Sequence, residues 1–382
     1  MRLRQLPFLL LLISSRYAMC QSYDTKIEHA AGFLEKKDYP SALNAFKDAF
    51  KDTATSTPYD FYFGAIAAVG CNEIPQAFEW LNTAQRRGLG LKKSDIEGLK
   101  KDSSLAILHS YAQWDVLISS MERASDEKLA MDKKRMDDWL SSVRQNRVGQ
   151  KEKGKYLPAG KGFALYYSQA DTLKVPFLVY VPDSYTSTRP MQTIVFLHGG
   201  VESRANFNDK DPDIGREPIF STGDSLNAII IYPFAKKDFG WVNQQAAFEQ
   251  VLLIIKEAEL VYNIDRNRLF LAGMSNGGSA SFWFASQHPN PFKGFLAISA
   301  LPALKIGNID FSHLSPEKPF YSVHAKDDEV FPYDSVRHTY DTEQGIAKGW
   351  HFETLPQGGH GFIYGPTGRE ILVHYLKKLM ED

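Results

Sequence analysis

The sequence is poor in cysteine: its 382 residues include only Cys20 and Cys71. A zinc site built on cysteines needs more thiolates than these two residues supply, so that class of metal site is excluded. If processing of the N-terminus removes Cys20, Cys71 is left alone and no intramolecular disulfide can form. We then expect the folded protein to be stable through its core alone.

An excess of charge is also lacking, since 44 lysines and arginines face 45 aspartates and glutamates, for a net charge of -1. The sequence therefore gives no electrostatic reason to expect nucleic acid or an anionic membrane as a partner. Beyond the N-terminus, no apolar run approaches the roughly 18 residues that a membrane-spanning helix requires. We expect no transmembrane segment.

The first residues follow the pattern of a secretory signal peptide. Two arginines precede the short apolar run Leu6–Ile13, and Ala18 and Cys20 supply small residues for cleavage. This pattern predicts a signal peptide over residues 1–20 and a secreted or periplasmic protein. Lipidation of Cys20 is the alternative, and the bulky Met19 before it argues against a lipoprotein.

Two similar segments in the first third of the chain predict helical hairpins. Pro40 and Pro75 lie 35 positions apart, and each is followed two residues later by an alanine. Proline is favoured in the first turn of a helix, and alanine allows two helices to pack closely. Residues 24–120 thus resemble tetratricopeptide repeats, with Ile96–Ile118 as a capping helix pair. Such repeats could bind a protein partner.

Residues 121–155 are densely charged and contain no proline. This composition predicts a solvated helix that runs into a linker.

From residue 156 to residue 382, apolar runs of strand length alternate with periodic stretches of helix length. Runs such as Ile194–Leu197 are apolar throughout, as is typical of parallel strands covered by helices on both faces. The alternation predicts an α/β fold with right-handed crossovers, opened by an antiparallel hairpin with its turn at 168–172. The expected strands are Gly162–Tyr167, Val175–Val181, Thr193–Leu197, Asn227–Tyr232, Arg268–Gly273, Gly294–Ser299, Pro319–His324 and Trp350–Leu355.

A nucleophile motif follows the fifth of these strands. Gly273-Met274-Ser275-Asn276-Gly277 fits the pattern G-x-S-x-G, and a helical stretch comes next. A sharp turn from strand to helix needs glycines on both sides of the serine, because side chains there would clash. Ser275 is therefore the predicted nucleophile.

A serine hydroxyl needs a general base, and His360 is the best placed histidine. It lies between glycines in a loop directly after the last expected strand. The other histidines that follow the candidate acids are His338, His351 and His374, which fall within expected helices or a strand. In this motif class the chain order is serine, acid, histidine, which His360 satisfies.

The acid that orients the histidine is predicted to be Asp328. It lies in a loop that leaves the end of a strand, where the active-site loops of α/β sheets gather. Its carboxylate would hold the imidazole tautomer and stabilise its positive charge. Asp327 and Glu329 are the neighbouring alternatives.

Two backbone N–H groups should bind the negative charge that develops on a substrate oxygen. One is expected from Asn276, directly after the nucleophile. The other is expected from the His198-Gly199-Gly200-Val201 loop, with Gly200 favoured over Val201. The His198 side chain is expected to be structural.

These residues together resemble the α/β-hydrolase superfamily over about residues 160–382, in the carboxylesterase group that includes dienelactone hydrolases, feruloyl and acetylxylan esterases, and secreted polyhydroxybutyrate depolymerase-like esterases. The resemblance rests on the loop at Gly200, the elbow at Ser275, the acid loop at Asp328 and the Gly-His-Gly run at His360. Ala325 departs from the glycine usual in this group. The resemblance implies hydrolysis of a small-molecule ester through an acyl-enzyme, with no metal or organic cofactor.

Two other functions share these residues. A peptidase of the prolyl-oligopeptidase type has the same fold and triad, but the first third of this chain is too short and too helical for a propeller domain. A non-catalytic scaffold would use the helical repeats for binding, although all three triad positions are filled. For substrate contacts the sequence suggests Val201 and Trp241 as walls of the pocket.

Overall fold

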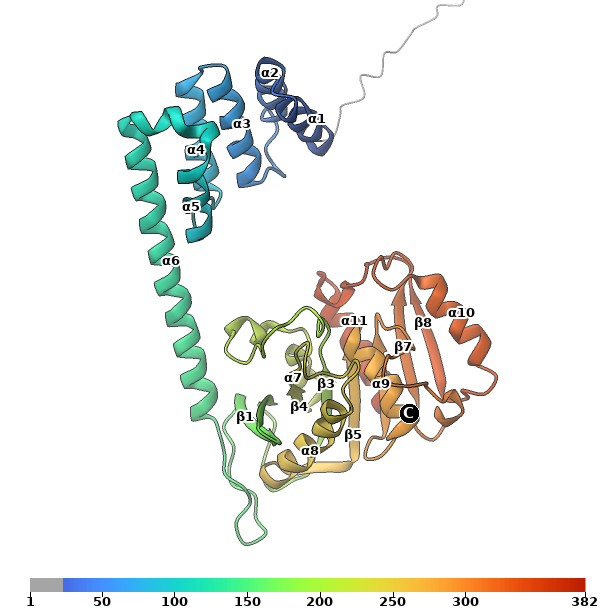
Figure 1. Cartoon of the computed structure of the whole chain (residues 1–382). Coiled ribbons are helices and arrows are strands. Elements are labelled where there is room, and N and C mark those ends of the chain that lie inside the picture. The colour runs from blue at the N-terminus through green and yellow to red at the C-terminus, as the bar shows by residue number, and fades with distance from the viewer. Residues whose placement is uncertain (1–22, 382) are drawn as a thin grey trace, which may run out of the picture. The chain divides into compact units, whose positions relative to one another are not determined.

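The computed structural model describes residues 23–381 (Figure 1). The signal peptide predicted for residues 1–20, and with it Cys20, lies outside the described residues. The described chain divides into two compact units, with the boundary between Lys133 and Lys134. The second unit begins before the predicted position 156, because Val143 is fully buried in the same core as its sheet.

The N-terminal unit is helical. Short turns join its first helices, and a 3-10 segment, Ser103–Ser110, precedes the last one. The helices are α1 (Tyr23–Glu35), α2 (Tyr39–Ala49), α3 (Pro58–Gly70), α4 (Ile74–Arg86), α5 (Lys93–Lys101) and α6 (Ala112–Gln145).

The two related segments occupy equivalent places in this unit. Pro40 lies in the first turn of α2 and Pro75 in the first turn of α4. Ala42 and Ala77, which follow them, are fully buried. Helix α1 packs on α2, and α3 packs on α4. The helical pairs thus have the pattern that the sequence suggested, and their kinship with tetratricopeptide repeats stays a prediction.

The expected capping pair at 96–118 has a different form. That stretch contains the end of α5, the 3-10 segment and the first turns of α6, so the two helices are separated by a 3-10 segment. Helix α6 is a single helix of 34 residues and crosses from the first unit into the second. Asp102, the residue after α5, caps the 3-10 segment by accepting a hydrogen bond from the Ser104 N–H at 2.8 Å. The chain therefore leaves the α-helical path at Asp102, within the stretch where the helix pair was expected.

The second unit contains an eight-stranded sheet with the order β1-β2-β4-β3-β5-β6-β7-β8. Strands β1, β2 and β4 pair antiparallel, and the pairs from β4 onward are parallel. This confirms the predicted α/β-hydrolase fold class. The strands are β1 (Gly162–Ala170), β2 (Leu173–Val181), β3 (Met191–Leu197), β4 (Ile229–Pro233), β5 (Ile264–Met274), β6 (Gly294–Ile298), β7 (Phe320–Ala325) and β8 (Trp350–Leu355).

Helices cover both faces of this sheet. One face packs against α8 (Gln245–Val261) and α9 (Asn276–Gln287), and the other against α7 (Phe220–Leu226) and α11 (Gly368–Glu381). Helix α10 (Tyr333–Glu343) lies between β7 and β8 in the chain. Because strand residues alternate between the faces, each apolar strand contributes to both cores, which explains the continuous apolar runs.

Candidate active site

The nucleophile candidate lies at the turn between β5 and α9. Ser275 has φ 54° and ψ −119°, a strained conformation for a residue with a side chain. Its N–H donates to the Ile298 carbonyl at 2.9 Å, which fixes the turn on β6. The residue is 8% exposed, so the surrounding structure holds it rigidly while a small part of it meets solvent.

The two motif glycines are required by close backbone approaches. A methyl group at Gly277 would overlap the Leu197 carbonyl oxygen, and one at Gly273 would overlap the Gly277 backbone. Both obstacles are main-chain atoms, which cannot move aside as a side-chain end could. The tight turn that the motif predicted is therefore set by β3 and by the start of α9.

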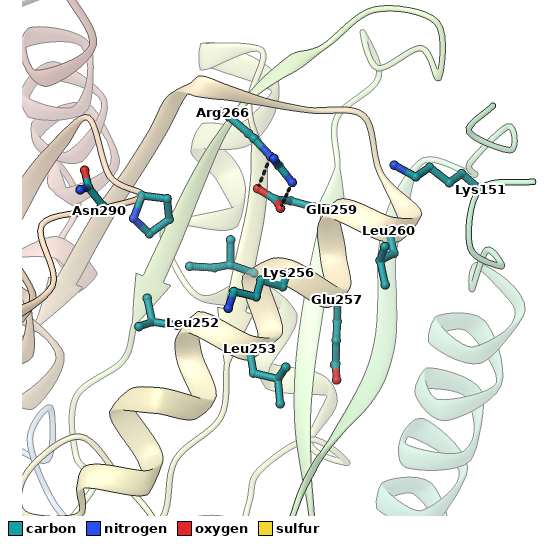
Figure 2. A pocket seen from close by; sticks show the side chains of 11 residues that line it. Lys151, Leu252, Leu253, Lys256, Glu257, Glu259, Leu260, Arg266 and Asn290 are labelled. Atoms are coloured by element: carbon teal, nitrogen blue, oxygen red, sulfur yellow. Dashed lines mark hydrogen bonds and ion pairs between the residues drawn. The ribbon is translucent and has the colours of Figure 1, made fainter. Parts of the chain in front are cut away.

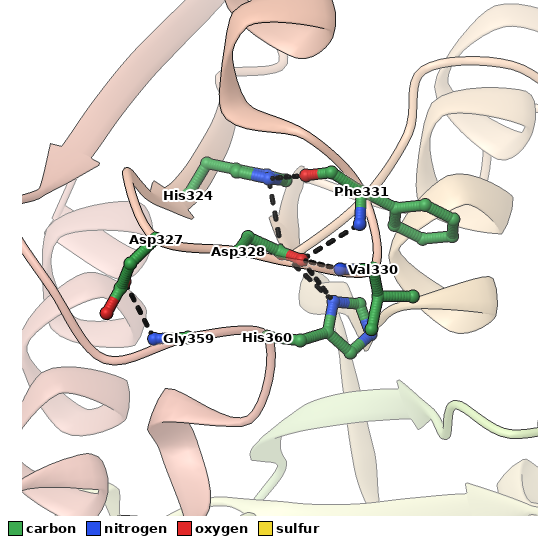
Figure 3. Close-up of polar contacts among 7 residues, drawn as sticks. All are labelled: His324, Asp327, Asp328, Val330, Phe331, Gly359 and His360. Atoms are coloured by element: carbon green, nitrogen blue, oxygen red, sulfur yellow. Dashed lines mark hydrogen bonds and ion pairs between the residues drawn. The ribbon is translucent and has the colours of Figure 1, made fainter.

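The predicted acid and base meet beyond the ends of β7 and β8 (Figure 3). His360 Nδ1 lies 2.9 Å from Asp328 Oδ2 and 3.1 Å from Oδ1. The Asp328 side chain is fully buried, and its Oδ1 accepts hydrogen bonds from the Val330 N–H at 2.9 Å and the Phe331 N–H at 2.8 Å. Two backbone donors thus hold this carboxylate toward the His360 imidazole.

The neighbouring acids have other positions. The Asp327 carboxylate is exposed and accepts hydrogen bonds from the Gly358 and Gly359 N–H groups at 3.1 and 2.8 Å. These backbone donors lower the pKa of Asp327. Glu329 is exposed to solvent. Asp327 therefore anchors the loop that carries His360, and Asp328 is the acid beside the imidazole.

A second buried histidine, which the sequence analysis did not single out, touches the same carboxylate. His324 Nε2 lies 3.2 Å from Asp328 Oδ2 and 2.8 Å from the Phe331 carbonyl oxygen. No motif pointed to it, although it stands four residues before Asp328 at the end of β7.

The loop after β3 has a buried polar support. His198 Nδ1 donates to the Gly199 carbonyl at 2.7 Å, and its Nε2 accepts from the Ala235 N–H at 3.0 Å. Burial lowers the pKa of His198 to about 3, so the ring is neutral. The Trp241 indole N–H donates to the His198 carbonyl at 3.1 Å. These contacts hold the loop, and the expected structural place of His198 agrees with them.

This loop presents backbone donors beside the nucleophile. A methyl group on Gly199 would lie 2.8 Å from Ser275 Cβ, so the two segments touch. The Val201 N–H is occupied, because it donates to Asn276 Oδ1 at 3.0 Å. Within residues 23–381, no protein acceptor takes the N–H of Gly200 or of Asn276. These two donors are free for a ligand oxygen.

Ser275 and His360 are not joined by a hydrogen bond within the described chain. Catalytic hydrogen bonds in unliganded enzymes are often long and tighten when substrate binds.

The suggested substrate contacts need correction. The Trp241 side chain is 1% exposed and packs against the His198 ring at 5.0 Å between centroids. Val201 is fully buried. Neither side chain offers a surface to a substrate, because both are used to support the loop after β3.

No protein-family model matches the chain. A probable feruloyl esterase C from Aspergillus flavus is 29% identical over 164 residues, which cover 41% of this chain and 56% of that protein. A bifunctional acetylxylan esterase/xylanase from Neocallimastix patriciarum is 26% identical over 171 residues, or 41% of this chain and 22% of that protein. The chain thus spans about half the length of the feruloyl esterases it matches.

This chain is similar to α/β-hydrolases of the carboxylesterase group. Solved structures with partial overlap include a ferulic acid esterase, with a TM-score of 0.46 and 18% identity over 57% of this chain and 98% of its own. A thermostable esterase has a TM-score of 0.45 and 22% identity over 57% of this chain and 62% of its own.

A cavity of about 660 Å³ in the hydrolase unit lies away from this chemistry (Figure 2). Its walls come from α8, including Leu252 and Leu260, and from Arg266 near the start of β5. Ser275 follows the other end of that strand, so this cavity does not include the candidate nucleophile. The described residues include no cluster of three His, Cys, Asp or Glu side chains that could hold a metal ion, and none of their helices is long and apolar enough to cross a membrane.

Proposed function

We propose that this protein is a serine hydrolase that cleaves carboxylic esters, with Ser275, Asp328 and His360 as its catalytic triad. The observation that carries the proposal is the buried Asp328 carboxylate, held by two backbone amides and placed 2.9 Å from His360 Nδ1. The similarity to feruloyl and acetylxylan esterases supports an ester as the substrate.

The proposed reaction begins when His360 Nε2 takes the proton of the Ser275 hydroxyl as its oxygen attacks the ester carbonyl. Because Asp328 faces His360 Nδ1, the proton of the resting imidazole is on Nδ1 and Nε2 is free to act as the base. The imidazolium then donates the proton to the departing alcohol oxygen, which leaves Ser275 acylated. Water, activated by the same imidazole, attacks the acyl-enzyme, releases the carboxylic acid and restores the serine.

The negative charge on the carbonyl oxygen requires donors in each tetrahedral intermediate. We assign this role to the N–H groups of Gly200 and Asn276, which have no protein acceptor in residues 23–381. Val201 is the weaker candidate, because its N–H already donates to Asn276 Oδ1. The Asn276 side chain thereby ties the two segments of the proposed oxyanion hole together.

The experiment that tests this function compares the protein with Ser275→Ala on p-nitrophenyl esters of increasing chain length, with methyl ferulate and acetylated xylan as candidate natural substrates. The proposal expects turnover by the protein and a loss of at least about 1,000-fold in the variant. Equal turnover by both proteins would place the reaction elsewhere. Turnover of acylated peptides instead of esters would favour the peptidase alternative.

We further propose that the protein is exported, on the strength of the N-terminal sequence pattern. Determination of the mature N-terminus in the secreted or periplasmic fraction tests this. The expected first residue is Gln21, and a diacylated Cys20 would identify a lipoprotein instead.

A further inference from the structure

His324 is a buried titratable residue that the proposed reaction does not use. It lies at the end of β7 and is 1% exposed. In Figure 3 its ring lies on the far side of Asp328 from His360, and dashed lines run from its Nε2 to Asp328 and to the Phe331 carbonyl. The carboxylate therefore stands between two imidazoles.

The proton on His324 can be placed from its neighbours. Both atoms near Nε2, the Phe331 carbonyl oxygen at 2.8 Å and Asp328 Oδ2 at 3.2 Å, are acceptors. Nε2 must therefore carry a hydrogen, which it donates to the Phe331 carbonyl, with Asp328 Oδ2 beside the same N–H. Burial lowers the pKa of His324, which keeps the ring neutral near pH 7. His324 thus acts as a fixed donor without bringing a charge to the site.

We propose that His324 is a positioning residue that acts through Asp328 on the base His360, and so sets the pH range in which the base is free. This inference rests on the proposed function only in taking His360 as the base. His324 acts on the Asp328 carboxylate in two ways. The positive end of its N–H dipole lies beside the Asp328 carboxylate, with Nε2 3.2 Å from Oδ2, and its bond to the Phe331 carbonyl keeps the Phe331 N–H directed at the same carboxylate.

The effect of this dipole has a definite sign. Without the positive end of the N–H beside it, the Asp328 carboxylate would stabilise the His360 imidazolium more strongly. Loss of His324 should therefore raise the pH at which His360 gives up its proton. Among the described residues, two further titratable groups lie near His324: His360 lies across Asp328, and the Tyr333 ring of α10 lies 6.3 Å away. Asp327 faces the backbone amides of 358 and 359.

The test compares His324→Leu with His324→Gln. Leucine removes the donor, whereas glutamine places an amide N–H at a similar reach. In the profile of kcat/KM against pH for a p-nitrophenyl ester, we expect the acid limb of the leucine variant to move upward by about 0.5 to 1 pH unit. The glutamine variant should keep its acid limb within about 0.2 unit of the unaltered protein, which a loss of packing alone would not predict.

A second measurement reads the same property without turnover. NMR titration of the His360 imidazole in both variants gives its protonation midpoint directly, so an inactive protein would refute the proposed function and still test this inference. Equal midpoints in the leucine variant and the unaltered protein, or equal shifts in both variants, would overturn the proposal. If His324→Leu does not fold, His324→Asn, whose amide is one methylene shorter, is used in its place with the same expected shift.

Discussion

The substitution Asp328→Asn replaces one carboxylate oxygen with an NH₂ group in a site where the orientation of the new amide is fixed. Asp328 Oδ1 accepts from the Val330 and Phe331 N–H groups, so the amide oxygen must take this place. An NH₂ there would face two donors. The amide nitrogen then takes the Oδ2 position, 2.9 Å from His360 Nδ1.

An NH₂ group in that position donates to Nδ1 and reverses the tautomer of His360. The imidazole hydrogen then lies on Nε2, which can no longer accept the Ser275 proton. For a triad of this kind, the loss in kcat is on the order of 10⁴-fold, which corresponds to about 5.5 kcal/mol in the barrier. Thermal stability should change little, because both backbone amides keep their acceptor and the His324 N–H keeps the Phe331 carbonyl as its own.

Steady-state kinetics on a p-nitrophenyl ester, with thermal unfolding in parallel, provides the assay. Asp327→Asn is the matched control, since an asparagine oxygen can still accept from Gly358 and Gly359, and its kcat should stay within about twofold. Asp328→Ala should also lose stability, by about 1 to 3 kcal/mol for each amide left unpaired. An Asp328→Asn variant that keeps more than about a tenth of kcat would refute this assignment of the acid.

Three further predictions follow from the same geometry. Gly277→Ala should destabilise the unit by about 3 kcal/mol or more, because its new methyl group overlaps the backbone of β3. The control Gly345→Ala, with open space around the new methyl group, should unfold at the temperature of the unaltered protein. A Gly277→Ala variant as stable as the unaltered protein would contradict this. Asn276→Ala removes the acceptor of the Val201 N–H and should lower kcat about tenfold with KM within about twofold, whereas a change confined to KM would exclude a role in the oxyanion hole. Burial lowers the pKa of His198 to about 3, so below pH 6.5 the unfolded chain binds more protons than the folded one, and the free energy of unfolding should fall by about 2 kcal/mol by pH 5. Urea unfolding at pH 7 and pH 5 should show a smaller fall in the His198→Asn variant than in the unaltered protein. An equal fall in both proteins would contradict this.

The sheet was predictable because each of its strands is a short apolar run between turn residues. All eight expected strands are present, with ends shifted by up to a few residues, and the hairpin of β1 and β2 turns at Asp171 within the expected segment. Helices α8 and α11, which are among the periodic stretches of helix length, bury apolar residues in the core. In such cases burial alone determines the pattern, so periodicity is a sufficient guide.

The candidate site was predictable where a backbone constraint leaves a mark in the sequence. The sharp turn at Ser275 demands its glycines, and the loop after β8 brings His360 to Asp328. Trp241 was assigned to the pocket wall because the sequence alone does not distinguish an aromatic side chain that packs beneath a loop from one that faces a ligand. His324 was missed because its contact with Asp328 depends on the local path of the chain after β7.

In the helical unit, the sequence indicated where α2 and α4 begin, through their prolines and buried alanines. The binding of a protein partner by these helices stays a prediction.

The most direct test of the central claim is the site of reaction with a fluorophosphonate, located by mass spectrometry of the digested protein. A serine activated by His360 and Asp328 should take up one label per chain on the peptide that contains Ser275, and Asp328→Asn should slow the labelling severely. Ser275→Ala should take up none. A label on another residue, or equal labelling of the Ser275→Ala variant, would contradict Ser275 as the nucleophile.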